Sequence, residues 1–389
     1  MPDIYRFRVT MRPLEPYTFG TDQNIAFPGQ SIRGRKASHY VGTSFYPEQT
    51  SILGLIRYLV LKSKDLLRAD FRYSAEEREK MNKLVGEKSF SFGESWNGNG
   101  SRFGVIQRIS PLFALIEESG KEHALVRNPF FHLKQKDEET DKASFDTLKI
   151  DMERKIKTNW GDIALPANYS AKEGLCSGFL DLNATKDQED RVIFNSFKEK
   201  SVVSVNKNGY GESDKKRKQD GFFRRQTIVP EDPTFRFAVY VDLSEKALPE
   251  KCVAYMGKKK SAFLIESSLE SVAEETNATT AFADTIRNLF RKFAEERGWS
   301  DAFAGWSYAL SDLILRSDAR YDDFCIVERK SLRNLTTSHK DGKISLAPNL
   351  THLAKAGSVF RSAPEKLEET VLREDKVAEI IGYNRIITF

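Results

Sequence analysis

The most constraining feature of this sequence is its opening order: a strand pattern, a long irregular segment, and then a helix pattern. Apolar and polar side chains alternate from Ile4 to Met11. This period of two predicts a strand with one buried face. Between Ile52 and Leu61 the apolar residues recur at helical spacing, and Thr50 or Ser51 is suited to cap that helix. A similar order of strand, helix and strands recurs in the second half, so we expect an α+β fold.

The segment between the first strand and the first helix is basic. From Gly20 to Pro47 there is little periodicity, which predicts a long loop. It contains Arg33, Arg35 and Lys36 with no acid beside them. Such cations can neutralise a phosphate backbone, in binding that weakens as salt rises. We therefore treat this loop as a candidate RNA contact.

A second basic stretch runs from Lys198 to Arg225. It holds nine cations and four acids, an excess that equals the formal net charge of +5 for the whole chain. Strand patterns at 201–205 and 235–241 lie on either side of its most basic part, residues 206–225, which predicts a projecting basic hairpin. Cations hold phosphates, and aromatic faces stack on unpaired bases. The plainer alternative is a solvated charged loop beside core aromatics. The candidate residues are Lys207, Tyr210, Lys215, Lys216, Arg217, Lys218, Phe222, Arg224 and Arg225.

Two glycine turns near the end of the chain form a third candidate. Ala356 to Phe360 reads Ala-Gly-Ser-Val-Phe, and Ile381 to Arg385 reads Ile-Gly-Tyr-Asn-Arg. Glycine lets the backbone approach a phosphate closely, and its N–H group can contribute to an anion-binding nest. The alternative is two tight turns with a purely structural role. The residues at issue are Gly357, Ser358, Arg361 and Arg385.

Composition excludes several other classes of protein. The chain has 389 residues, with 61 Lys plus Arg against 56 Asp plus Glu, which is too balanced for a polyelectrolyte. Cys176, Cys252 and Cys325 form no CxxC pair, which argues against a zinc ribbon or disulfide scaffold and fits a reducing compartment. We find no signal peptide, no apolar run long enough to span a membrane, and no metal-ligand or nucleophile motif. We expect a soluble cytoplasmic protein without cofactor, metal or catalytic role.

Local signals mark further elements and a boundary. Ser74 with Glu77 predicts a capping box, and Gly86 suits the end of that helix. Apolar residues at helical spacing predict another helix over 281–297. A shift in composition at 183–190 predicts two domains, residues 1–185 and 186–389.

Several short segments resemble the CRISPR-associated RAMP superfamily. These are Leu14 to Phe19 and the turn and helix from Phe45 to Arg57. Ala356 to Phe360 resembles a segment of one branch, the 5′-handle-capping subunit of the type III-B (Cmr) effector complex, and Leu165 to Gly174 and Asp220 to Arg225 are similar to the same branch. The equivalent capping subunit of the Csm complex is the relative with which this branch is most easily confused. The turn before the helix reads Pro-Glu-Gln-Thr where the family has Pro-Pro-Ser-Pro-Thr.

The resemblance implies two ferredoxin-like (RRM-like) domains with long insertions. It implies a non-catalytic subunit for antiviral defence that holds the 5′ handle of the guide RNA. Its partners would be the large polymerase/cyclase-like subunit and the neighbouring backbone RAMP subunits. The hairpin from Lys207 to Arg225 would be the thumb that kinks the RNA. Beside the basic loop and the glycine turns, RNA would be bound by Gln49, Ser51 and Arg57.

Two alternatives remain open from the residues. His39 is one of five scattered histidines and would serve as acid or base in a metal-independent RAMP endoribonuclease that processes CRISPR transcripts. In the leading hypothesis His39 is instead one of the RNA-binding residues. The other alternative is a protein-interaction scaffold with no RNA contact.

Overall fold

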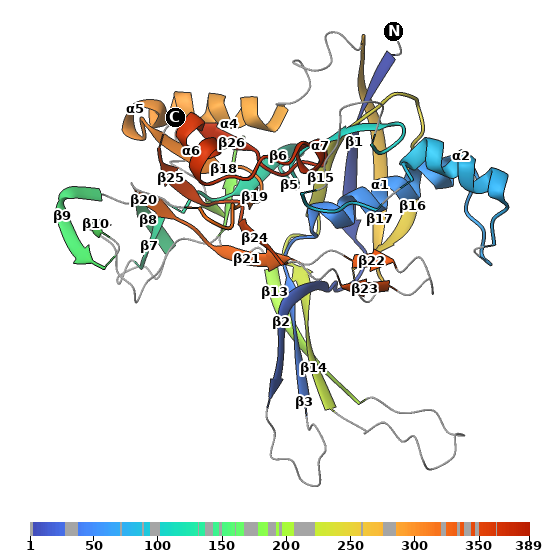
Figure 1. The fold of residues 1–389 in the computed structure, drawn as a ribbon, viewed down its shortest axis with the longest axis horizontal. Helices are drawn as coiled ribbons and strands as arrows, with labels where there is room; N and C mark the ends of the chain where they lie inside the picture. Colours follow the sequence, from blue (N-terminus) through green and yellow to red (C-terminus); the bar gives the residue numbers. More distant parts are fainter. Residues whose placement is uncertain are drawn as a thin grey trace.

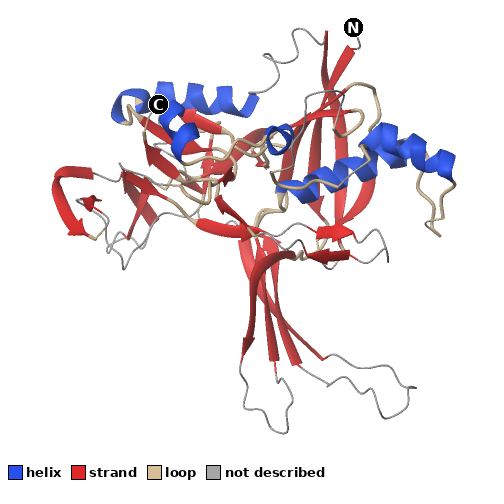
Figure 2. Cartoon of the chain, viewed as in Figure 1, coloured by secondary structure: helices blue, strands red, loops and turns tan. Residues whose placement is uncertain are grey.

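The structure is a computed structural model, and it is a mixed α/β fold with mostly antiparallel sheets and few helices (Figure 2). It describes residues 3–27, 38–70, 72–87, 89–93, 102–130, 132–136, 143–147, 150–159, 161–166, 178–185, 192–193, 197–205, 222–257, 260–274, 285–319, 324–332, 335–337, 344–346, 350–362 and 364–389.

A nine-stranded sheet forms the centre of the molecule. β1 lies between β15 and β17 and is antiparallel to both. The sheet takes strands from both sides of the expected boundary at residue 185. In spatial order the strands are β12 (Val192–Ile193), β11 (Phe179–Asp181), β6 (Lys121–Arg127), β5 (Phe113–Glu118), β15 (Arg236–Leu243), β1 (Asp3–Pro13), β17 (Ser261–Glu274) and β16 (Lys251–Met256), with β4 (Ile106–Ile109) also paired to β15.

Helices cover the two faces of this sheet unevenly. α1 (Gln49–Ser63) buries its apolar stripe against one face, together with Phe7, Val9 and Met11 of β1. α4 (Thr285–Glu296) packs Ile286 and Phe290 over part of the other face, and α5 (Trp299–Ala302) follows it. Each fully buried apolar side chain of this size contributes about 1.5–3 kcal/mol, so these two interfaces hold the body together.

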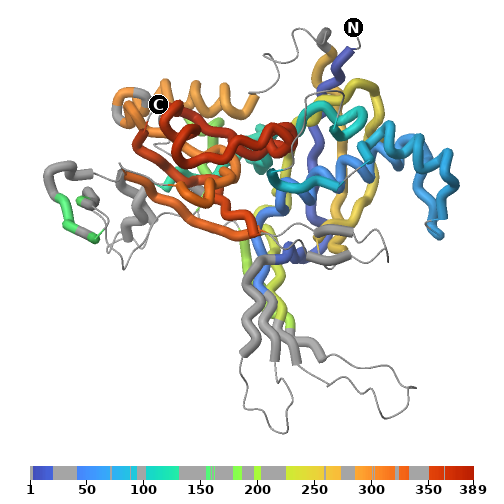
Figure 3. Tube along the Cα trace, viewed as in Figure 1, coloured from blue at the N-terminus to red at the C-terminus, as the bar shows by residue number. Residues whose placement is uncertain are grey.

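Four strands leave the body and form an arm (Figure 1). The outer pair on each side is antiparallel, and the central pair, β14 with β3, is parallel. The arm therefore joins a segment near the N-terminus to one from the middle of the chain (Figure 1), and the coloured ends of both segments meet the body at the base of the arm (Figure 3). The order is β13 (Phe197–Val205), β14 (Phe222–Pro230), β3 (Ser38–Ser44) and β2 (Phe19–Phe27).

Small sheets and hairpins make up the rest. One sheet consists of β20 (Phe324–Ile326), β25 (Val359–Arg361), β18 (Trp306–Ala309) and β26 (Ile386–Thr388), and a second of β19 (Leu313–Ile314), β24 (Thr351–Ala354) and β21 (Arg329–Leu332). The hairpins are β7 (His132–Lys136) with β8 (Ala143–Thr147), β9 (Ile150–Thr158) with β10 (Gly161–Pro166), and β22 (Leu335–Thr337) with β23 (Ile344–Leu346). The remaining helices are α2 (Ala75–Val85), α6 (Pro364–Thr370) and α7 (Lys376–Ile380).

Most of the expected helices and strands are present. β1, β13, β15, α1 and α4 lie where the sequence predicts them, although 281–284 fall outside the described residues. The capping box of α2 forms, with Ser74 accepting from the Glu77 amide and Gly86 at φ 82° after the last turn. The cap expected for α1 is wrong. Its N-cap is Glu48, two residues before Thr50, and the Glu48 side chain makes no capping hydrogen bond because it binds Lys330 instead.

Two expectations about the arm are wrong. Residues 20–47 are not one loop, because β2 and β3 lie within them. The partner of β13 is β14 and not the strand at 235–241, which belongs to the main sheet. The period of two is weak in these segments because an arm that leaves the body needs no continuous apolar face, and backbone pairing holds its strands. No helix in the described part of the chain is long and apolar enough to cross a membrane.

Candidate nucleic-acid interface

The arm brings the two basic segments of the sequence to the same place. At its far end Phe27 pairs with Ser38, Ser38 with Phe222, and Phe222 with Val205. These four residues form one row across the sheet, about 15 Å wide at the usual spacing of strands. Residues 28–37 and 206–221 leave from and return to this row but lie outside the described residues. The points where these two segments join the arm are thus neighbours in space, although the segments are about 180 residues apart in the sequence.

Both segments that meet there are basic. Residues 28–37 carry Arg33, Arg35 and Lys36 and no acid. Residues 206–221 carry five cations and three acids, and include the run Lys215 to Lys218. A long flexible polyanion is the ligand that such a combination of cations attracts. Lys207 and Tyr210 belong to the second segment and, like these cations, lie outside the described residues.

Other expected contacts lie in the arm strands themselves. His39 on β3 pairs with Ala26 on β2 and with Phe223 on β14. Arg224 and Arg225 follow Phe222 and lie opposite Tyr40 and Val41 of β3. His39, Phe222, Arg224 and Arg225, which the sequence places in two separate candidates, are thus members of one sheet.

A cleft lies where the arm meets the body, with a volume of about 580 Å³. We call it the arm-base cleft. The turn between β3 and α1 forms one wall, and residues 328–332, 355–356 and 382–383 form the other. Gln49, Ala356 of the first glycine turn, and Gly382 and Tyr383 of the second therefore line the same cavity. Its charged lining residues are Glu48, Arg127, Asp312, Glu328, Arg329, Lys330 and Lys355.

A network of ion pairs joins the walls of the arm-base cleft. Lys330 Nζ lies 2.8 and 2.7 Å from the two carboxylate oxygens of Glu48 and also contacts Asp312. The other carboxylate oxygen of Asp312 accepts from the Ala356 amide at 2.9 Å. Burial acts to lower the pKa of Lys330, but Asp312 and Glu48 outweigh it and hold that pKa well above its usual value. Lys330 is therefore a permanent cation that ties the first turn of α1 to the Ala356 turn.

The two glycines of the C-terminal turns are required by close packing. Gly382 has φ +98°, and a Cβ there would lie 2.5 Å from Nε2 of Gln49 and 2.7 Å from the carbonyl oxygen of Ser110. Gln49 Nε2 donates to that carbonyl at 2.6 Å. At Gly357, also at φ +98°, a Cβ would lie 2.9 Å from the Phe130 ring. Both glycines fit the structural alternative, since protein atoms occupy the space beside them.

We expect Gly382→Ala to destabilise the protein by about 1–3 kcal/mol through backbone strain, and by more through displacement of Gln49. Urea unfolding measures the loss. Gly120→Ala is the matched control, because Gly120 has φ +74° but nothing within 4 Å of the added Cβ. Equal losses of unfolding free energy in the two variants would show that close packing against Gln49 does not contribute to stability.

The remaining expected contacts lie apart from the arm-base cleft. Ser51 is exposed on the first turn of α1 and Ser358 is fully buried, with its hydroxyl donating to the Lys355 carbonyl. Arg57 lies over the Phe103 ring at 5.2 Å, and burial together with Arg102 lowers its pKa to about 10. Arg361 is in β25, and the Arg385 guanidinium donates to the Glu379 carbonyl. None of these five side chains lines the cleft.

Two cleft residues, Arg127 and Tyr46, were not among the residues expected from the sequence. The Arg127 guanidinium lies 4.4 Å from the centre of the Tyr46 ring, and both residues line the arm-base cleft. The Tyr46 hydroxyl has no hydrogen-bond partner among the described residues, and burial raises its pKa above the usual value. Tyr46 adjoins the Pro-Glu-Gln-Thr turn, so that motif points to its position, whereas Arg127 is a lone arginine at the end of a buried strand.

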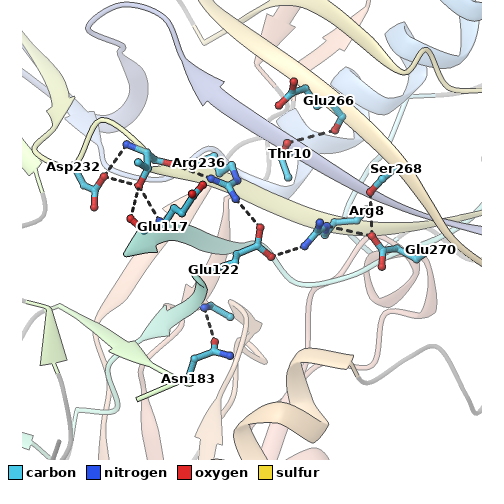
Figure 4. Close-up of polar contacts among 12 residues, drawn as sticks. Arg8, Thr10, Glu117, Glu122, Asn183, Asp232, Arg236, Glu266, Ser268 and Glu270 are labelled. Atoms are coloured by element: carbon cyan, nitrogen blue, oxygen red, sulfur yellow. Dashed lines mark hydrogen bonds and ion pairs between the residues drawn. The ribbon is translucent and has the colours of Figure 1, made fainter. Parts of the chain in front are cut away.

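The face of the main sheet that carries Arg8, Glu122 and Arg236 differs from the arm in its balance of charge (Figure 4). Glu122 accepts from Arg8 at 2.5 Å and from Arg236 at 2.6 Å, and Arg8 also lies 3.2 Å from Glu270. A shallow cavity of about 610 Å³ on this face is lined by three arginines and by Glu117, Glu122 and Glu266. Its positive charges are thus matched by carboxylates, so this face lacks the cationic excess found at the arm.

The chain was compared with known proteins. No family model matches it, and no curated protein matches it. Among solved structures it is similar to a chain of a type III-B Cmr-beta complex bound to cognate target RNA, with 11% identity and a TM-score of 0.46 over 98% of this chain and 96% of that one. A chain of the same complex with target RNA and AMPPnP gives 10% identity and a TM-score of 0.44 over the same shares. In the described part of the chain no cluster of His, Cys, Asp or Glu suits a metal ion.

Proposed function

We propose that this chain is an RNA-binding subunit of a type III CRISPR effector ribonucleoprotein. In this proposal the arm and the arm-base cleft hold the 5′ repeat-derived handle of the guide RNA. The observation that carries it is the parallel pairing of β3 with β14, which joins two basic segments at one end of a projecting sheet. Phosphate contacts supply affinity there, and stacking with base-edge hydrogen bonds reads the handle.

The finer assignment rests on the sequence resemblance. It favours the type III-B branch and a subunit present at the 5′ end of the guide RNA, with the large polymerase/cyclase-like subunit and the backbone RAMP subunits as neighbours. It also favours ferredoxin-like domains. The sheet β20-β25-β18-β26 supports one such unit, since its first strand in sequence lies between the third and the last, and α6 and α7 connect these two.

We propose a non-catalytic role. A general base must lie within about 3 Å of the group whose proton it takes, and a carboxylate bonded to a histidine can orient that histidine for the task. The described residues contain one His–carboxylate pair, His123 with Asp181 at 2.8 Å. That pair lies on β6 and β11 of the main sheet and not on the arm.

The test uses the purified full chain and a labelled repeat-derived RNA in the presence of EDTA. We expect the RNA to be bound, to compete better than a scrambled RNA of equal length, and to stay intact. Specific cleavage that is lost in His39→Ala would establish the endoribonuclease instead. Equal affinity for the scrambled RNA, together with no RNA recovered from the complex in cells, would contradict the handle assignment.

A further inference from the structure

Two of the four cations that line the arm-base cleft have no carboxylate partner. Lys330 and Lys355 are each held by carboxylates of the cleft walls. Arg127 and Arg329 form no ion pair with any residue that the structure describes. Because the lining also holds three carboxylates, the cleft as a whole is close to neutral. It is therefore the free guanidinium groups, and not an excess of charge, that this site offers to a ligand.

Aromatic side chains hold Arg127 at the wall of the cleft. Arg127 ends β6 opposite Phe179 of β11, and the Tyr308 hydroxyl donates to its carbonyl oxygen at 2.6 Å. Its guanidinium carbon lies 4.4 Å from the centre of the Tyr46 ring, which packs in turn against Phe179 and Phe237 at 5.4 and 5.8 Å. One face of the guanidinium is thus covered by a fixed ring, while the side chain stays partly exposed.

A guanidinium supported in this way can hold a nucleic-acid base. Unpaired bases stack on arginine planes as they do on aromatic rings. The Tyr46 ring already restricts the Arg127 side chain, so less conformational entropy is lost when a base covers the other face. Lysine at this position would carry the same charge but would offer no plane.

The carboxylates of the lining favour a neutral base over an anionic group beside Arg127. A phosphate, or the acidic side chain of another protein, would lie in the same cleft as Glu48, Asp312 and Glu328. Like charges repel, and a lining with four cations and three carboxylates does little to offset that repulsion. A base is uncharged and meets no such penalty.

The cleft has the volume of a site for one small molecule. Its volume of about 580 Å³ lies within the range of about 300–1,000 Å³ that is usual for such pockets, so it suits a single nucleotide and not a folded RNA segment. β21, which carries Arg329, contacts β2 at the base of the arm (Figure 1). Arg329 is exposed there, beside the path of a strand that continues along the arm.

We propose that the arm-base cleft takes up one nucleotide that is turned out of the bound RNA strand. The base of this nucleotide stacks on Arg127, and the adjoining phosphate pairs with Arg329. This inference rests on the proposed function, which places RNA on the arm and in the cleft. It adds that one position of the RNA is held by its base and not by charge.

A series of repeat-derived RNAs tests the proposal, each with one nucleotide replaced by an abasic one. We expect one position at which the loss of the base weakens binding to the parent about tenfold, the cost of one stacking contact. In Arg127→Lys, which keeps the charge but not the plane, the same position should become insensitive. Arg72→Lys is the matched control, because Arg72 is exposed on the turn before α2, and it should behave as the parent does.

A salt series separates the base contact from the phosphate contact. Arg329→Ala should flatten the slope of log affinity against log salt by about 0.7, the value for one phosphate of a single strand, and leave the sensitive position in place. Arg127→Lys should do the reverse. Urea unfolding of both variants verifies that the fold is intact.

Photocrosslinking identifies the occupant in the complex isolated from cells. Ser331→p-azidophenylalanine, in the cleft wall, is expected to crosslink to RNA. Ile156→p-azidophenylalanine is the control, because Ile156 is 49% exposed on the distant β9–β10 hairpin. A crosslink from position 331 to an acidic protein segment in place of RNA would overturn the proposal.

The abasic series also distinguishes this inference from the proposed function. RNA that is bound with every abasic position tolerated, or with the same sensitive position in Arg127→Lys as in the parent, would overturn the inference and leave the proposed function standing. A parent protein that binds none of the RNAs would overturn both.

Discussion

Replacing Arg33, Arg35 and Lys36 together by alanine is expected to weaken RNA binding by about 100-fold near 0.1 M salt, because each lost phosphate contact forfeits counterion release. The slope of log affinity against log salt should flatten by about 2 for single-stranded RNA. Titration of a labelled repeat-derived RNA over a salt series measures both quantities. The replacement of Lys215, Lys216 and Arg217 is expected to act in the same way, since both segments meet the same end of the arm.

A charge-matched variant separates local contact from net charge. Lys246, Lys292 and Lys366 are exposed and lie off the arm, and their replacement by alanine changes the net charge equally. We expect that variant to bind RNA as the parent does. If it weakened binding as much as the arm variants, or if the arm variants kept the parent's salt slope, the arm would not be the RNA contact.

Lys330→Met is expected to destabilise the protein by about 3 kcal/mol, because it leaves two carboxylates facing each other without their cation. Removing one partner of a buried ion pair costs about 3–5 kcal/mol. The lower value applies here because 19–21% of the side-chain surface of Lys330, Glu48 and Asp312 is exposed. Urea unfolding at neutral pH measures the loss. Lys251→Met removes an exposed pair with Glu266, and a loss below about 1 kcal/mol is expected there.

The pH dependence of the stability difference between the parent and Lys330→Met tests whether the charge of Lys330 causes it. The pKa of Lys330 is raised in the folded protein above its usual value of 10.5. The stability that it contributes is thus fully present below pH 10.5 and is lost as pH rises through the raised pKa. The difference between parent and Lys330→Met should stay constant across neutral pH and shrink only in strong alkali. Lys330→Arg should recover part of the loss, and a Lys330→Met protein as stable as the parent would show that the network contributes nothing.

Local signals in the sequence were sufficient for elements whose stability is local. The Ser74 and Glu77 pair predicts the start of α2 because both halves of a capping box lie within one turn. The apolar stripe from Ile52 to Leu61 predicts the buried face of α1, and the alternation from Ile4 to Met11 predicts β1. In α1 and β1 the pattern reflects burial of one face against a single partner surface.

The arm and the arm-base cleft could not be predicted in this way. β3 pairs locally with β2, but nothing in residues 38–44 indicates its second partner, β14, which lies 184 positions further along the chain. The two basic segments were recognised in the sequence, but their attachment to the same end of one sheet was not predicted. Similarly, Lys330 has no motif, and only the fold brings Glu48 and Asp312 to it.

The parallel pairing of β3 with β14 also determines when the arm can form. β2 with β3 and β13 with β14 are each joined by short segments, so each pair closes locally and early. The two hairpins can join only after residue 225 has left the ribosome and the body has brought them together. Until then each hairpin has an inner edge without a partner. The arm is consequently a late step in the folding of this chain, and the interval before it closes is when an RNA or a chaperone would protect those edges best.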